Sequence, residues 1–493
     1  MSITDAPGSP PATVPQASFV LAPVVALAAF MEVLDLSIAN VALQNIAGEL
    51  GASSDEATWI LTSYLATNAI VLPMSGWLAT VLGRKRYYVG CIIGFGASSF
   101  LCGVAPTLAI LILARALQGL IGGGLQPVSQ AILADSFSPA QRGMAFAFYG
   151  MAVVVAPAVG PTLGGWITDN VDWRWVFLIN VPISVGLALL ISRLVQDPPH
   201  LVAQRLQLKA GGIRIDYIGF GLLALGFSLL QVVLDRGQQD DWFASHFIVA
   251  AALLSAVALI SFVAWELKTS QPIVDLRLFA NRNFALANLL MFMLGFVLLG
   301  STALLPEFTQ QLLGYTAMEA GLVISPGGFA LMLVMPLVGR LSGRVDARLM
   351  IAFGLAVASW SLYHMSGFSL AVDYWTIAQA RLVQAIGLGF LFIPITTLAY
   401  VDLPPEKSNN ASALINVSRN IGGSVGISFL TTMLQRHLQA HNVTLVEHVT
   451  SGNPAYRQAI AGLQQQFVAA GSSKLQALHQ AQALSRKTSP NRG

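Results

Sequence analysis

The sequence predicts an all-α integral membrane protein built from two related helix bundles, and three observations lead to this prediction. Of the 493 residues, 55% are hydrophobic and only 10% are charged, whereas roughly 25% are charged in typical soluble domains. Apolar stretches of about 20 residues, the length that crosses a bilayer, recur along most of the chain. Two arginines, Arg115 and Arg381, lie inside such stretches with matching neighbours. A duplicated protein embedded in lipid is therefore expected.

Marking each run of about 20 mostly apolar residues gives about thirteen predicted spans. In chain order they cover residues 19–43, 57–80, 87–105, 107–134, 143–168, 175–195, 215–235, 245–266, 284–305, 317–339, 348–367, 374–401 and 410–434. Residues 1–18 are rich in Pro, Ser and Ala and have no basic start, which predicts a disordered tail and not a cleaved signal. Residues 437–493 are too polar to cross lipid and are predicted to form a polar tail.

Lys and Arg fall in every second connection between the spans, and this asymmetry predicts the orientation because basic loops stay in the cytoplasm. The basic connections contain, among others, Arg84, Lys85, Arg142, Arg340 and Lys407. The opposite connections hold only Arg174 and Arg236 before the last span. The N-terminus is therefore predicted to be cytoplasmic, and an odd number of spans places the tail outside. The net charge of +3 is too small to indicate nucleic-acid binding.

The two arginines define an internal repeat. Ala114 to Gln118, followed by Gly123, matches Ala380 to Gln384, followed by Gly389. Because the repeated unit recurs after eight spans, both copies have the same orientation, as in transporters whose halves are related by an axis along the membrane normal.

This repeat predicts the domain organisation. Residues 19–196 form an N-terminal bundle of six helices, 197–282 hold two inserted spans with cytoplasmic linkers, and 283–436 form a C-terminal bundle of five spans. The final span of the second bundle is expected to be missing.

Two acids on the first span, Glu32 and Asp35, lie three residues apart and hence on nearly the same helix face. Asp35 and Arg115 lie at the same depth, roughly 12 Å of helix rise from the outer ends of their spans, so they are predicted to meet. A charge at this depth is a functional-site hypothesis by default, and a carboxylate whose Arg partner moves away gains proton affinity. Asp35, Glu32 and Arg115 are the predicted proton-coupling residues. A permanent ion pair that only orients helices is the alternative.

A substrate cavity is expected between the two bundles near the bilayer midplane. Arg381 has no acid at matching depth in the span 284–305, whose nearest acid is Glu307 at the outer end, so it faces either water or an anionic group on the substrate. Methionine side chains are flexible enough to repack around varied ligands, although they are also common in packed cores. The predicted lining residues are Arg381, Gln118, Gln384, Met291 and Met332.

Two glycine-containing segments stand out in the sequence, one inside a span and one in a turn between spans. In the span 143–168, glycines permit close packing and prolines permit a bend; these residues are Gly160, Pro161, Gly164 and Gly165. A short basic turn follows the span 57–80, and positive-inside anchoring also explains its charges; it includes Gly76, Gly83, Arg84 and Lys85.

These segments together resemble the major facilitator superfamily. The resemblance rests on the turn from Gly76 to Lys85, on Arg115 with Gln118 and Gly119, and on Gly160-Pro161 with Gly164-Gly165. The segments 34–43, 173–182 and 234–243 make the chain similar to the fourteen-span drug:proton antiporters of the EmrB and QacA type, closest to EmrB, over about residues 19 to 436.

The resemblance implies a major facilitator fold and proton-coupled export of amphipathic drugs from a bacterial cytoplasmic (inner) membrane by alternating access. It places Asp35 and Arg115 at motif positions of spans 1 and 4 and Gly160-Pro161 at the antiporter motif. It also implies a periplasmic membrane-fusion adaptor and an outer-membrane channel as partners. A specific exporter of a metabolite, lipid or siderophore, or an inactive or sensor-like truncated transporter, is the alternative function.

The chain departs from the family pattern in two places. Thr80 stands where the cytoplasmic turn commonly has an acid, and no fourteenth span is predicted in residues 437–493. Neither a nucleotide-binding loop nor a catalytic cluster is found in the sequence, so an enzyme is not expected, and no cofactor, metal site or nucleic-acid partner is predicted.

Overall fold

The structure, a computed structural model, describes residues 20–210, 216–448, 454–471 and 473–487. Every secondary-structure element in these residues is a helix, which confirms the predicted all-α class. The chain divides into two compact units, residues 1–428 and 429–493. The predicted tail 1–18 lies outside the described residues.

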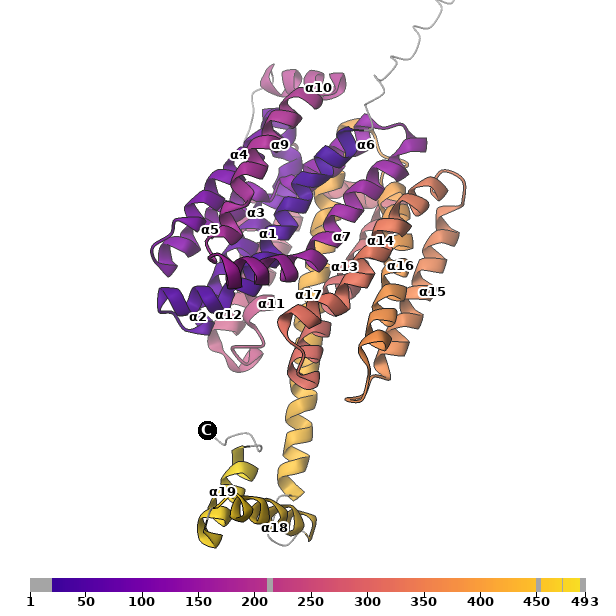
Figure 1. Cartoon of the computed structure of the whole chain (residues 1–493). Helices are drawn as coiled ribbons and strands as arrows, with labels where there is room; N and C mark the ends of the chain where they lie inside the picture. Colours follow the sequence, from indigo (N-terminus) through magenta and orange to yellow (C-terminus); the bar gives the residue numbers. More distant parts are fainter. Residues whose placement is uncertain (1–19, 211–215, 449–453, 472, 488–493) are drawn as a thin grey trace, which may run out of the picture. The chain divides into compact units, whose positions relative to one another are not determined.

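The first half of the larger unit contains a helix for each predicted span (Figure 1). Its helices are α1 (Leu21–Leu50), α2 (Ser54–Ala57), α3 (Trp59–Leu82), α4 (Arg84–Gly103), α5 (Leu108–Gly122), α6 (Leu125–Ser136), α7 (Pro139–Asn170), α8 (Trp175–Leu178) and α9 (Asn180–Leu194). Helix α1 packs against α7, α3 against α5, and α4 against α9.

Glycine and proline interrupt two of these spans. The predicted span 107–134 is divided into α5 and α6 at Gly123 and Gly124. Helix α7 bends by 45° between Pro157 and Val159, because Pro157 and Pro161 have no backbone N–H to continue the helical hydrogen bonds. The predicted bend in this segment is thus confirmed.

The inserted segment forms a helical hairpin that packs on the first half. It comprises α10 (Pro199–Ala210), α11 (Tyr217–Arg236), η1 (Trp242–Ala244), α12 (His246–Lys268) and η2 (Leu276–Ala280). Helix α11 packs against α12 and α3. The Thr62 hydroxyl of α3 donates a hydrogen bond to Asp235, and the Arg236 guanidinium lies 5.0 Å from the ring centroid of Trp59. Polar contacts therefore hold the insertion against α3.

The second half consists of α13 (Arg282–Leu313), α14 (Ala317–Leu341), α15 (Ala347–Ser366), α16 (Tyr374–Ala399), η3 (Pro405–Lys407) and α17 (Ser408–His448). Helix α14 packs against α16 and also against α7 of the first half. Gly143 and Gly339 make this contact close, because a Cβ at Gly143 would lie 2.7 Å from the Gly339 carbonyl oxygen. The two halves thus meet through α7 and α14.

Ten helices in the described residues are long and apolar enough to cross a membrane, or eleven if the bent α7 counts as one span. The predicted count of about thirteen is higher because α4 and α17 are helical but more polar. Helix α4 starts with Arg84, Lys85 and Arg86, and α17 starts with Ser408 and two asparagines. Both helices direct polar side chains into the protein, as shown below, which lowers their average hydropathy.

The smaller unit contains the end of α17 together with α18 (Pro454–Ala469) and α19 (Lys474–Lys487). Helices α18 and α19 pack against each other. Among the described residues of this unit, no helix is long and apolar enough to cross a membrane.

Candidate functional site

Asp35 and Arg115 form a buried ion pair inside the first half, as predicted from their equal depth. Arg115 Nη1 lies 2.6 Å from Asp35 Oδ2, and neither side chain is exposed. The pair joins α1 to α5. A buried pair of this kind is held only where further hydrogen bonds satisfy the remaining donors and acceptors.

Asn180, Gln118 and Ser99 form a hydrogen-bonded cluster around the pair, although Arg115 Nη2 is buried without a hydrogen-bond partner among the described residues. Asp35 Oδ1 accepts from Asn180 Nδ2 of α9 at 2.7 Å and from Gln118 Nε2 at 3.2 Å. Gln118 Oε1 accepts from Arg115 Nη1 at 2.7 Å. Ser99 Oγ of α4 accepts from Gln118 Nε2 at 2.7 Å and from Asn180 Nδ2 at 3.2 Å. Four helices, α1, α4, α5 and α9, therefore meet at this cluster.

Tyr64 of α3 connects the ion pair to a second carboxylate. Its ring lies 4.4 Å from the Arg115 guanidinium, close enough for a cation–π interaction. Its hydroxyl lies 3.5 Å from Glu32 Oε1 on α1. Tyr64 therefore contacts both the Arg115 guanidinium and the Glu32 carboxylate.

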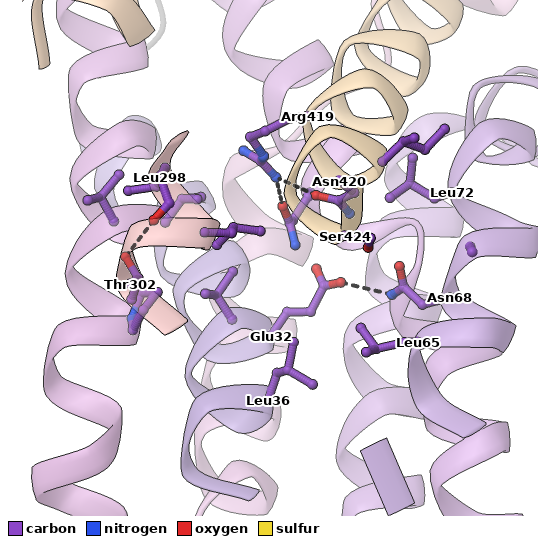
Figure 2. Close-up of a pocket in the computed structure, with 18 of the residues that line it drawn as sticks. Glu32, Leu36, Leu65, Asn68, Leu72, Leu298, Thr302, Arg419, Asn420 and Ser424 are labelled. Carbon is purple, nitrogen blue, oxygen red and sulfur yellow. Dashed lines mark hydrogen bonds between the residues drawn. The ribbon is translucent and has the colours of Figure 1, made fainter. Parts of the chain in front are cut away.

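Glu32 lines a cavity between the two halves. Figure 2 shows its carboxylate beside Asn68 of α3, whose Nδ2 donates to Glu32 Oε1 at 3.1 Å. Its other oxygen, Oε2, is buried and has no hydrogen-bond partner among the described residues. Most of the cavity wall is apolar, as is usual for small-molecule sites; the apolar residues include Leu36, Leu65, Leu72, Val153, Leu298, Leu331 and Leu388.

The inserted helix α11 supplies part of the same wall. Phe227, Leu230, Gln231 and Leu234 face the cavity, and Gln231 Oε1 accepts a hydrogen bond from Ser424 Oγ of α17 at 3.3 Å. The insertion is therefore part of the site and not only a linker between the bundles.

Two arginines of the second half also line the cavity. Arg419 of α17 donates to Gln126 of α6 and lies 3.5 Å from Asn420 Oδ1, an arrangement visible in Figure 2. Arg381 of α16 contacts Ser301, Thr302 and Gln384. Together with Glu32, these are the charged residues of the lining.

Of the five residues predicted to line the cavity, only Arg381 does so. Gln118 lies instead in the Asp35 cluster, and Gln384 is the buried hydrogen-bond partner of Arg381. Met291 is fully buried in the core, whereas Met332 is 45% exposed on the outer surface of α14. The structure corrects these four assignments. The glutamines turn toward the arginines one helical turn before them, and the methionines lie on other helix faces.

The glycines of the predicted antiporter motif serve packing between α7 and α1. A Cβ at Gly160 would lie 2.2 Å from Ser37 Oγ, and one at Gly164 would lie 3.1 Å from Ile38 Cγ2 and 3.2 Å from Ile38 Cα. Among the described residues, apart from the neighbouring residues and backbone of its own helix, no atom lies within 4 Å of a Cβ at Gly165. Pro161 follows the bend in α7. This segment sets how closely α1, which carries Glu32 and Asp35, approaches α7.

The predicted cytoplasmic turn joins the two halves. Arg84 is buried, donates from Nη2 to Asp135 Oδ2 of α6 at 2.7 Å, and donates from Nε to Asn409 Oδ1 of α17 at 2.8 Å. Ser408 Oγ of α17 donates to the same Asp135 oxygen at 2.9 Å. Gly83 has φ +92°, and Lys85 donates its backbone N–H to Asp197 at 2.8 Å.

Thr80 takes part in this junction without a charge. Asn409 Nδ2 donates to Thr80 Oγ1 at 3.2 Å, and a Cβ at Gly76 would lie 2.9 Å from the Asn409 carbonyl oxygen. Thr80, which stands where the family commonly has an acid, thus contacts the second half through a hydrogen bond between two neutral side chains.

The sequence interpretation missed several members of the site. Asn180 and Ser99 complete the Asp35 cluster, and Arg419 contributes a second buried guanidinium to the cavity lining, beside Arg381. Arg419 was detectable in the same way as Arg115, because it is a charged residue inside the predicted span 410–434. Isolated Asn and Ser residues in apolar stretches give a weaker signal, since many of them bond only to their own helix.

Comparison with known proteins agrees with the fold and the motifs. The family model of the Major Facilitator Superfamily matches residues 25–427. Multidrug export protein EmrB of Haemophilus influenzae is 39% identical over 429 residues, which cover 87% of this chain and 82% of that protein. Fatty acid resistance protein FarB of Neisseria gonorrhoeae is 38% identical over 452 residues, which cover 91% of this chain and 87% of that protein.

Solved structures show the same fold at low sequence identity. The human organic anion transporter MFSD10 gives a TM-score of 0.59 at 15% identity, covering 83% of this chain and 92% of that one. The proton:xylose symporter XylE gives a TM-score of 0.59 at 12% identity, and the match covers 85% of this chain and 89% of that one.

Proposed function

Because the chain belongs to the Major Facilitator Superfamily and to its EmrB-like drug exporters, we propose that it exports amphipathic compounds in exchange for protons, by alternating access. A bacterial inner membrane is the proposed location. The observation that carries the proposal is the buried Asp35–Arg115 pair next to an apolar cavity between the two halves. Membership in a family of transporters also argues against an enzyme.

Asp35 is the proposed site of proton coupling. As a carboxylate it attracts the Arg115 guanidinium across 2.6 Å, and protonation removes that attraction. Arg115 then keeps its contacts with Gln118 and Tyr64 but loses its counter-charge. Because the pair joins α1 to α5, a change in its charge alters how these helices pack. Glu32, which lies in the cavity itself, is the second candidate for proton binding.

Alternating access requires that the contacts on each side of the cavity open in turn. We assign this role on the cytoplasmic side to the junction of Arg84, Asp135, Ser408 and Asn409. Hydrogen bonds from Arg84 to Asn409 and from Ser408 to Asp135 hold this junction closed.

Inverted membrane vesicles provide the direct test. With the protein present, a proton gradient that is acid inside is expected to drive accumulation of a fluorescent amphipathic dye, and collapse of the gradient should release it. A sensor-like or inactive protein would show no accumulation above empty vesicles. Gradient-driven uptake of one metabolite, lipid or siderophore, with no dye uptake, would instead establish the specific exporter.

The cytoplasmic junction yields a separate prediction. Thr80 and Asn409 lie on different halves with their side chains 3.2 Å apart, so cysteines at both positions are expected to react with a short bifunctional thiol reagent. The cross-link should stop efflux, and a reducible reagent should allow its recovery. Each single cysteine variant is the control. Full efflux by the quantitatively cross-linked protein would rule out opening at this junction.

A periplasmic adaptor and an outer-membrane channel are the proposed partners in a double-membraned host. Cross-linking in the native membrane is expected to recover the adaptor. If efflux across the cell envelope did not require an adaptor, the proposal of these partners would be wrong, whereas the proposed antiport would still stand.

A further inference from the structure

The two halves surround their repeated arginines with different partners. The offset that relates Arg115 to Arg381 also relates Gln118 to Gln384 and Asp35 to Ser301. The hydrogen bonds repeat as well, because Arg381 Nη1 donates to Gln384 Oε1 and, at 3.0 Å, to Ser301 Oγ. Ser301 therefore occupies the place of the carboxylate in the first half.

Arg381 consequently lacks a counter-charge. In the part of the chain that the structure describes, its side-chain partners are neutral: Ser301, Gln384 and Thr302, whose Oγ1 accepts from Nη2 at 2.6 Å. Only 5% of Arg381 is exposed. A buried guanidinium without an anion is unfavourable, because its hydration is lost and not replaced by an opposite charge.

Gln384, the neighbour of Arg381, also lacks a hydrogen-bond partner for one of its polar atoms in the described part of the chain. Its Nε2 is buried and has no acceptor among the described residues. In the first half, the corresponding Gln118 Nε2 donates to Asp35 Oδ1 at 3.2 Å. A guanidinium and an amide N–H thus both lack the anion that their counterparts have.

The cavity gives an anion access to this position. Arg381 lines the cavity, whereas Arg115 and Asp35 do not. In Figure 2, Thr302 and Leu298 lie on one side of Glu32, and Asn68 lies on the other. The charged lining residues are one carboxylate and two guanidinium groups, which favours an anionic ligand. The apolar residues nearby, among them Leu298, Leu331 and Leu388, suit a hydrocarbon chain.

We propose that Arg381, with Ser301, Thr302 and Gln384, binds the anionic head group of an amphipathic ligand such as a long-chain carboxylate. An Arg guanidinium binds a carboxylate through two parallel hydrogen bonds. The ligand then supplies the charge that Asp35 supplies in the first half. Transport of this ligand rests on the proposed function, but its binding is measurable without a gradient.

The substitution Ser301→Asp tests the subsite, because it places a fixed carboxylate beside Arg381 as in the first half. Binding of radiolabelled dodecanoate to the purified full-length protein in lipid nanodiscs is expected to weaken at least about tenfold, since one charge-assisted hydrogen bond contributes at least that factor. Ser301→Asn, which has nearly the size of the aspartate variant but no charge, should weaken dodecanoate binding less than Ser301→Asp does. Dodecyltrimethylammonium has a hydrocarbon chain of the same length but a cationic head group, and it is the control ligand for dodecanoate.

Arg381→Gln is the second variant, and it should also lose dodecanoate binding while the ammonium ligand binds no more weakly. Equal dodecanoate affinity in the wild type, Ser301→Asp and Arg381→Gln would overturn the proposal. So would a wild-type protein that binds the ammonium ligand and not dodecanoate. Because no gradient is used, binding that follows this pattern supports the subsite even if vesicles show no proton-driven export.

Discussion

Replacing Asp35 by Asn is expected to reduce proton-driven efflux in inverted vesicles to the level of empty vesicles. The amide keeps the size of the side chain but cannot take up a proton, so the charge of the Arg115 environment no longer changes during the cycle. Gradient-independent exchange of labelled for unlabelled substrate should persist, because Asp35 does not line the cavity. The two assays together separate loss of coupling from loss of substrate binding.

The controls address folding. Asp35→Asn leaves a buried Arg115 without its anion, a change that costs roughly 3–5 kcal/mol in other proteins, so the melting temperature should be measured with the activity. Asp35→Glu keeps a titrating group and should retain part of the coupled efflux. Asp169→Asn, at the exposed end of α7, should behave like the wild type. Full proton-driven efflux by a folded Asp35→Asn protein would transfer the coupling role to Glu32 or another acid.

The pairing of Asp35 with Arg115 was predictable because charges are rare inside apolar spans and must find partners there. The sequence repeat then related Arg381 to Arg115, and the prolines of the span 143–168 predicted the bend in α7 because they lack a backbone N–H. These features depend on local sequence and on depth along a helix. Depth is readable, since each residue of an α-helix adds about 1.5 Å.

The direction of each helix face was not predictable in the same way. In a soluble helix the apolar stripe marks the face toward the core, but in a bilayer the outer surface is apolar too. Met291 and Met332 therefore look alike in the sequence, although one is buried and the other is exposed. For the same reason, the sequence did not show that α11 turns Phe227 and Gln231 toward the cavity.

Hydrogen bonds between polar side chains of different helices also could not be predicted from the sequence. Asn180 reaches Asp35 only because α9 packs against α1 and α4, and no spacing along the chain encodes that contact. Likewise, Asn409 became recognisable as a contact of Arg84 and Thr80 only once the two halves were placed together.

A second large effect is expected from Gly160→Ala in α7. The added methyl group would lie 2.2 Å from Ser37 Oγ and 2.5 Å from Ser37 Cβ, so α1 must move away from α7. Overpacking of this kind typically costs about 1–3 kcal/mol. We expect a lower melting temperature of the purified protein and a loss of most efflux, because α1 also carries Glu32 and Asp35.

Gly165→Ala is the matched control, since it adds the same methyl group to the same helix at a position where no atom of another described element lies within 4 Å. Alanine favours helices over glycine by about 1 kcal/mol, and this gain applies to both variants, so the difference between them isolates the contact with Ser37. Adding Ser37→Gly to the Gly160→Ala protein removes the clashing side chain and should restore stability and efflux. If Gly160→Ala and Gly165→Ala instead melted at the same temperature and transported equally, close α1–α7 packing at Gly160 would not be required for function.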